Sequence, residues 1–171
     1  HEELSDRPLL KSLGTGVYFK VKEYTTFDLS TGDRVVILTE NTTPIGKAYN
    51  KLIKDWVTDE YQRVIFVHDD VIIEDRHLEE KLEKYLKKYD IIGLAGGTQP
   101  QIKAPALWHI MCKKHFGTVG HFVNNHQNWY GTTFGVSDVR VAIVDGVFIG
   151  VNRDVLEKKN LRFDEDLPHF H

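Results

Sequence analysis

The sequence predicts an α/β fold, a three-layer sandwich with a mostly parallel central sheet. Between residues 35 and 97, short apolar runs typical of buried strands alternate with segments whose apolar residues recur at helical spacing. Strands joined by a helix pair in parallel through a right-handed crossover. A chain of 171 residues with 41% hydrophobic content suffices for a hydrophobic core, so we expect residues 1–171 to form a single domain.

The first strand and helix of this pattern occupy residues 35–57. Residues 35–38 are fully apolar, which is typical of a buried parallel strand, and a polar loop follows at residues 39–43. Pro44 stands where the first turn of a helix would begin, and the apolar residues after it recur at helical spacing. Upstream, residues 17–22 carry two lysines, and we expect them to form an edge strand.

The next strand, at residues 63–67, ends in His68 and two adjacent carboxylates, Asp69 and Asp70. Two acids at the end of a buried strand repel each other and lose hydration unless something pairs with them. A divalent cation removes both penalties, and oxygen ligands suit Mg²⁺ or Mn²⁺. Ligands of open α/β sheets also bind at the carboxyl ends of the strands. The alternative is a solvated acidic turn, which the apolar runs on both sides disfavour.

The following segments extend the alternation and then depart from it. Residues 74–89 have one apolar stripe on an otherwise charged helix. Residues 90–97 predict a third strand that stops at a glycine pair, where the backbone can turn tightly or approach a ligand. Residues 98–138 are rich in His, Asn, Trp and Gly without a sustained period, and we expect a long substrate-binding loop region. Their histidines lack the close spacing typical of zinc ligands.

Residues 139–151 form either a strand pair or one long strand, interrupted by Asp145 and Gly146. A carboxylate inside such an apolar run must find hydrogen-bond donors or face a water-filled pocket. Asp145 therefore either faces a ligand-binding cleft or braces a bulge. Asn152 is a candidate N-cap for a short helix that follows.

The chain's composition excludes several classes. The net charge is −3 with no block of Lys and Arg, so a nucleic-acid polymer is not an expected partner. Cys112 is the only cysteine, which excludes an internal disulfide and is compatible with a reducing compartment. No apolar run is long enough to span a membrane and no signal peptide is evident. We expect a soluble, cytoplasmic protein, with peripheral association with a membrane left open.

Four motifs occur in order along the chain. They are Gly-Lys-Ala-Tyr-Asn-Lys at residues 46–51, Val-Ile-Phe-Val-His-Asp-Asp-Val at 64–71, Val-Asp-Gly-Val-Phe-Ile at 144–149 and Phe-Asp-Glu at 163–165. From about residue 33 onward, this pattern resembles the family-2-like glycosyltransferases of the GT-A fold, particularly a branch with a His-Asp-Asp-Val motif. The resemblance implies a GT-A-like nucleotide-diphospho-sugar transferase domain. It implies transfer of a sugar from a nucleotide-diphosphate donor to a hydroxyl group of a carbohydrate, lipid or protein, with Mn²⁺ or Mg²⁺ as cofactor.

The resemblance also implies roles for individual residues. Asp70 would be the direct metal ligand, Asp69 would hold the metal or the ribose, and His171 or His169 matches a late metal-ligand position. The nucleotide would contact Thr39, Glu40, Asn41, Lys47, Asn50 and Asp69, with Asn50 bracing the loop at residues 39–43.

On the acceptor side, the resemblance implies Asp145, Asp164 and Glu165 as candidate catalytic residues. The family's base generally lies in an acidic pair after the Phe-Asp-Glu segment, whereas this chain ends at His171. Truncation at the C-terminus therefore leaves open whether the base is present, and Asp164, Glu165 and Asp166 are the candidates within the chain. At His169 and His171, a disordered tail or the remnant of a tag is the alternative to a metal-ligand pair.

Two other functions remain open at this stage. The first is a non-catalytic nucleotide- or carbohydrate-binding module that kept the scaffold and lost the base. The second is a nucleotidyltransferase, which shares a strand-end acid pair but would normally carry a glycine-rich basic phosphate loop, and none is evident in the sequence.

Overall fold

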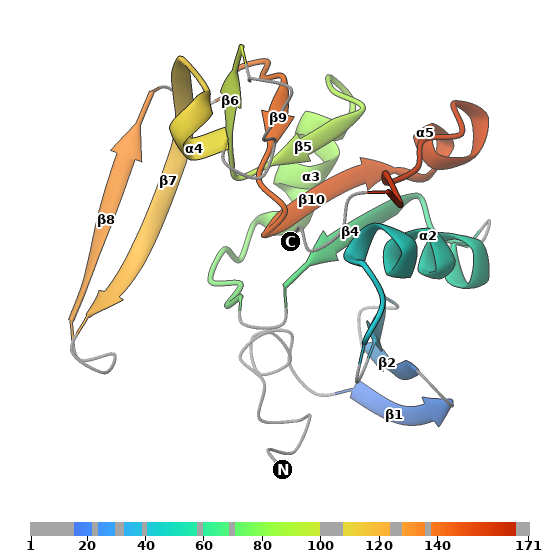
Figure 1. Cartoon of the computed structure of the whole chain (residues 1–171). Helices are drawn as coiled ribbons and strands as arrows, with labels where there is room; N and C mark the ends of the chain where they lie inside the picture. The colour runs from blue at the N-terminus through green and yellow to red at the C-terminus, as the bar shows by residue number, and fades with distance from the viewer. Residues whose placement is uncertain are drawn as a thin grey trace.

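The structure is a computed structural model with mixed α/β architecture (Figure 1). It describes residues 16–21, 24–29, 33–38, 41–57, 60–68, 71–99, 108–123, 128–135 and 138–166. The described strands form three sheets, and every ladder between them is antiparallel.

The first sheet is a meander of three strands near the N-terminus. Its order is β1 (Gly16–Val21), β2 (Tyr24–Leu29) and β3 (Arg34–Leu38). Among the described strands, β1 lies at the edge of this sheet, as predicted from its lysines. The strand β2 was not predicted.

The second sheet carries the strand that leads to the acid pair. Its central strand is β10 (Phe148–Asn152), which pairs with β4 (Arg63–Val67) on one side and with β5 (Ile91–Gly93) on the other. Phe148 lies opposite Val67 and Ile149 lies opposite Phe66. Successive side chains of a strand face opposite sides of the sheet, so this sheet has two apolar faces.

Helices cover both faces of this second sheet. On one face, Phe66 and Val151 pack against Ile53 of α2 (Ile45–Trp56) and against α5 (Arg153–Lys158). On the other face, Phe148 packs against α3 (Leu78–Leu86). The main described core therefore surrounds β4 and β10, immediately before the acid pair.

The third sheet has the order β8-β7-β6-β9. Its strands are β6 (Ala95–Thr98), β7 (Lys114–Val123), β8 (Asn128–Phe134) and β9 (Ile143–Val144), and the short helix α4 (Trp108–Met111) lies beside β6. Figure 1 shows the hairpin of β7 and β8 extending away from the helices. The expectation of a long loop across residues 98–138 was wrong for the described part, because cross-strand pairs such as Thr118 and Thr133 form a regular ladder.

The predicted mostly parallel sheet is also wrong for the described residues, and the three-layer sandwich around one central sheet is not confirmed. The strand β3 pairs with β2 through a short connection instead of with β4. The neighbour of β4 is β10, which runs in the opposite direction. Backbone hydrogen bonds to another strand define each of these pairings, and the local periodicity of a strand does not encode its partner.

Several local predictions are closer to the structure. The helix predicted at residues 45–57 is α2, and the strand pair predicted around Asp145 and Gly146 is β9 and β10. The helix predicted at residues 74–89 is shorter, and the strand predicted at residues 90–97 divides into β5 and β6 of different sheets. No helix in the described ranges is both long and apolar enough to cross a membrane.

Candidate functional site

The polar loop before α2 is held by its own side chains. Asn41 Oδ1 accepts hydrogen bonds from the backbone amide of Thr43 at 3.1 Å and from its hydroxyl at 2.7 Å, and Asn41 Nδ2 donates to Thr43 O at 2.8 Å. Asparagine often forms such Asx-turns, in which its side chain bonds to the backbone two residues further along. Pro44 then occupies the N-cap position of α2. Of the predicted nucleotide contacts, Asn41 is thus a turn residue, and Thr39 and Glu40 lie outside the described residues.

Asn50 joins the middle of α2 to the segment at residues 161–166, which follows α5. The backbone amide of Phe163 donates to Asn50 Oδ1 at 2.9 Å, and Asn50 Nδ2 donates to Phe163 O at 2.9 Å. The same nitrogen donates to Glu165 Oε1 at 2.8 Å. Asn50 was expected to brace the loop at residues 39–43, whereas its described partners lie in the C-terminal segment. The side-chain amide of Asn50 therefore pairs with both the N–H and the C=O of Phe163, as the backbone of a neighbouring strand would.

One helical turn earlier, Gly46 lets the same segment approach α2 closely. Gly46 is buried, and a Cβ atom at this position would overlap the carbonyl oxygen of Asp164. Because the obstructing atom belongs to the backbone, a side-chain rotation cannot relieve the overlap. Gly46 and Asn50 therefore fix the segment that carries two candidate catalytic carboxylates.

Three aromatic rings continue this contact into the core. The ring centroids of Tyr49, Phe66 and Phe163 lie 4.9 to 5.0 Å apart in tilted and edge-to-face arrangements, which are favoured by aromatic pairs. Burial raises the pKa of the Tyr49 hydroxyl above its usual value. Since Phe66 belongs to β4, the cluster ties the C-terminal segment to the strand that precedes the acid pair.

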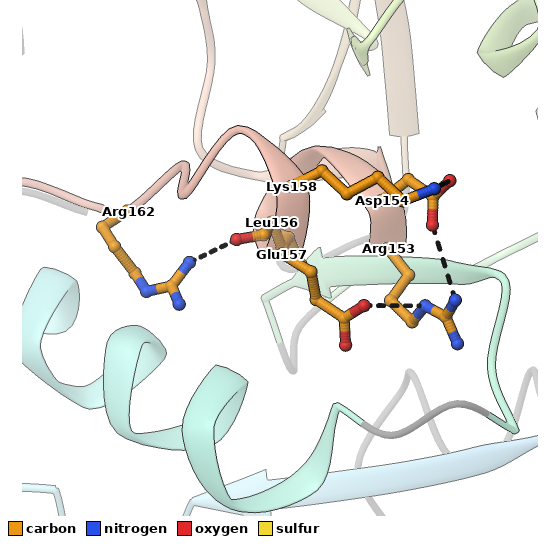
Figure 2. A network of polar contacts seen from close by, with 6 residues as sticks. All are labelled: Arg153, Asp154, Leu156, Glu157, Lys158 and Arg162. Carbon is orange, nitrogen blue, oxygen red and sulfur yellow. Dashed lines mark hydrogen bonds and ion pairs between the residues drawn. The ribbon is translucent and has the colours of Figure 1, made fainter.

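The start of the C-terminal segment is attached to α5 (Figure 2). Arg162 Nη1 donates to Leu156 O at 2.6 Å and to Leu161 O at 2.7 Å. Within α5, Arg153 contacts Glu157 at 3.3 Å, and Lys158 contacts Asp154 at 2.7 Å and holds the pKa of that carboxyl below its usual value. These bonds connect the helix and the segment into one local unit.

An open groove of about 640 Å³ runs between α2 and this segment. It is lined by Lys47, Asn50, Lys51, Lys54, Arg162, Phe163 and Glu165. The groove brings together three residues predicted from the sequence, namely Lys47, Asn50 and Glu165. Lys51, Lys54 and Arg162 were not predicted, although the spacing of the lysines along α2 was a usable signal.

The family of this chain is shown by comparison with known protein families. Residues 28–171 match the model of a family described as glycosyltransferase-like. The chain belongs to this glycosyltransferase-like family. The resemblance to family-2-like glycosyltransferases is thereby confirmed at the level of the family, and family membership implies a sugar donor and an acceptor. No curated protein and no solved structure matches the chain.

In this glycosyltransferase-like chain, Asp145 lies apart from the groove, in the bend between β9 and β10. Its Oδ1 accepts from the Val147 amide at 2.9 Å, and its Oδ2 accepts from the Trp108 indole nitrogen at 2.8 Å. Its own amide donates to Ala95 O at 2.8 Å. The Asp145 carboxylate thus accepts hydrogen bonds from two donors, as expected of a residue that braces a bulge. Its role at an acceptor site stays a prediction.

In the glycosyltransferase-like chain, the residue that precedes the acid pair is bonded to this bend. The His68 amide donates to Val147 O at 3.2 Å, and His68 O accepts from the Val71 amide at 3.4 Å, so the residues that flank the pair are bonded to each other. Asp69, Asp70, His169 and His171 lie outside the described residues. Within the described ranges, no group of three or more His, Cys, Asp or Glu side chains could hold a metal ion.

Proposed function

We propose that this chain transfers a sugar from a nucleotide-diphosphate donor to a hydroxyl acceptor and uses a divalent cation. The observation that carries the proposal is membership of the glycosyltransferase-like family over residues 28–171. The His-Asp-Asp-Val motif at the end of β4 supports the choice of donor, because its two carboxylates could hold a divalent cation that neutralises a diphosphate.

The metal-binding part of the proposal rests on Asp69 and Asp70. Their carboxylate oxygens are the ligands that Mg²⁺ or Mn²⁺ prefers. The residues on either side of the pair, His68 and Val71, are held by backbone hydrogen bonds. Asp70 would bind the cation directly, Asp69 would bind the cation or the ribose, and His171 would be a late ligand. The cation would offset negative charge as the diphosphate leaves.

The acceptor-activating part of the proposal rests on the C-terminal segment. A base must accept the proton of the attacking hydroxyl if the anomeric centre inverts. Glu165 is our first candidate because Asn50 holds one of its oxygens, which leaves the second for the proton. Asp164 is the second candidate, and its Oδ1 accepts from the Asp166 amide at 2.9 Å.

We assign Asp145 a positioning role within the same proposal. Asp145 holds the Val147 amide, and the Val147 carbonyl in turn accepts from His68, which precedes the acid pair. This chain of bonds leads from the carboxylate to the end of β4. Loss of Asp145 should therefore weaken donor binding through geometry and not by removing a proton acceptor.

The donor and metal are tested by titrating uridine, guanosine and cytidine diphosphates, with Mn²⁺ or with a chelator. One nucleotide should bind in a Mn²⁺-dependent manner, and Asp70→Asn should weaken it by at least about tenfold, since it removes a ligand charge and keeps the shape. Glu60→Gln, an exposed acid elsewhere, is the matched control. Equal affinity of wild type and Asp70→Asn, with and without Mn²⁺, would rule the site out.

Transfer is tested by nucleoside diphosphate release from sugar nucleotides with a panel of hydroxyl acceptors. Glu165→Gln should lower turnover while leaving nucleotide affinity unchanged. Metal-dependent binding by the wild type without any release would favour the non-catalytic binding module. In a parallel assay with nucleoside triphosphates and sugar 1-phosphates, release of pyrophosphate would favour a nucleotidyltransferase.

A further inference from the structure

The strand β8 is an outer strand of the third sheet, whose order is β8-β7-β6-β9. It pairs with β7 along its whole length, from Asn128 to Phe134, and no other described strand pairs with it. Figure 1 shows the hairpin extending away from the helices, with β8 on its outer side. An outer strand presents a row of unpaired N–H and C=O groups, with which a strand of another chain can pair.

The composition of β8 differs from that of the other outer strands of the three described sheets. Three of those strands carry a charged residue, namely Lys20 in β1, Arg34 in β3 and Arg63 in β4. The other two, β5 and β9, have only three and two residues. Charges, prolines and short lengths are the usual means by which proteins prevent pairing between edge strands. The seven residues of β8, Asn-Trp-Tyr-Gly-Thr-Thr-Phe, include no charged residue and no proline.

We propose that β8 pairs antiparallel with β8 of a second copy of this chain, around a two-fold axis at Gly131. Gly131 is the middle residue of β8 and is exposed. Such a contact uses the same strand of both copies, so it is closed once two copies have met. It joins the two four-stranded sheets into one continuous sheet and does not depend on the chemistry of the acid pair.

The sequence of β8 is complementary to itself in this register. Trp129 would lie opposite Thr133 of the second copy, and Tyr130 would lie opposite Thr132. Aromatic and β-branched residues are favourable partners across antiparallel strands, whereas like charges are unfavourable. A two-fold axis brings identical residues close to each other, so a strand without charge meets its own copy without repulsion. This matters here because the whole chain has a net charge of −3.

The size of the contact predicts the strength of the dimer. A standard stable interface involves about 20–30 residues on each side. The seven residues of β8 fall short of that number. We therefore expect a dimer that dissociates on dilution, with a dissociation constant in the micromolar range.

Sedimentation velocity of the full chain, at concentrations from about 1 to 100 μM, measures this equilibrium. The fraction of dimer should rise with concentration, and no larger species should form. Gly131→Lys should raise the dissociation constant by about tenfold or more, because it places two ammonium groups at the axis. The backbone of Gly131 does not have a positive φ, so a lysine can adopt it. Thr118→Lys, an exposed change on the inner strand β7, is the matched control and should dimerise as the wild type does.

A cysteine at the axis tests the register, and it does so even if Gly131→Lys fails to fold. Opposite Cα atoms of an antiparallel pair lie about 4.5–5.5 Å apart, a distance that a disulfide can span. Gly131→Cys should therefore form a disulfide-linked dimer on mild oxidation, whereas Thr118→Cys should not. The native Cys112 is buried, so the wild type is the control for unspecific linkage.

Three results would overturn the proposal. The first is a wild type that stays monomeric over the whole concentration range or forms species larger than a dimer. The second is a folded Gly131→Lys variant that dimerises as well as Thr118→Lys, which would place the interface elsewhere. The third is Gly131→Cys that becomes linked no more readily than Thr118→Cys.

Discussion

Asn50 donates a hydrogen bond to the carboxylate of Glu165 at 2.8 Å, although 115 positions separate the two residues. The same side chain satisfies both backbone groups of Phe163. One amide in α2 therefore determines where a candidate catalytic carboxylate lies. The contact joins the Ala-Tyr-Asn motif of α2 to the Phe-Asp-Glu motif of the C-terminal segment.

Replacing Asn50 should destabilise the fold. Asn50→Ala leaves both backbone groups of half-buried Phe163 without this partner, and we expect a loss of about 1–3 kcal/mol in the free energy of unfolding. Asn50→Asp should be at least as costly at neutral pH, because it removes the donor and places a second carboxylate beside Glu165. Urea denaturation measures both effects. Lys54→Ala, an exposed change in the same helix, is the control, and an equal loss in Asn50→Ala and Lys54→Ala would contradict the role of the amide.

We expect Gly46→Ala to destabilise the protein, although alanine is usually preferred to glycine in helices. In an unobstructed helix, alanine is favoured over glycine by about 1 kcal/mol. Here the added methyl group would overlap the backbone of Asp164, and we expect a net destabilisation of about 1–3 kcal/mol. Thermal unfolding should show a lower melting temperature than that of the wild type. Lys47→Ala is the neighbouring exposed control, and a higher melting temperature for Gly46→Ala would show that the segment does not pack at this point.

Asp145 and Trp108 should be energetically coupled. Asp145→Asn either turns an amide donor toward the indole N–H or leaves the Val147 amide without its acceptor. We expect a loss of about 1–3 kcal/mol, and a smaller loss when Trp108→Phe has already removed the indole donor. A double-mutant cycle in urea measures this coupling. Strictly additive losses would indicate that the hydrogen bond contributes nothing, and unaltered stability with lost transfer would restore the acceptor-site role.

Tyr49 should make the fold sensitive to alkaline pH. Burial disfavours the phenolate and raises the pKa of Tyr49 in the folded state. Its contribution to stability is therefore complete below the unfolded pKa of 10.0 and is lost as pH rises from there through the folded pKa. Tyr49→Phe should lose less stability than the wild type between about pH 9 and pH 11. Denaturation across this range tests the point, with Tyr61→Phe as a control outside the ring cluster. Parallel pH profiles for wild type and Tyr49→Phe would contradict it.

Local sequence patterns predicted the elements that are defined by one buried face. The helix α2 was predicted almost to its ends because its apolar residues recur at one helical face after Pro44. The interruption at Asp145 was predicted because a carboxylate does not belong inside an apolar strand. In contrast, β2 and the hairpin of β7 and β8 were missed, since backbone pairing with a neighbouring strand defines them and their own residue patterns do not record it.

The sequence by itself determined the order of the motifs, the family that they indicate, and the helix and strand that carry them. Only the tertiary structure decided that β4 pairs antiparallel with β10, that Asn50 holds Phe163 and Glu165, and that Arg162 joins the lysines of α2. The physical reason is that periodicity records which face of an element is buried, while the partner on that face is selected by packing and hydrogen bonds over long stretches of chain. The need for glycine at position 46 is evident only from the tertiary structure, in which the backbone of Asp164 lies against it.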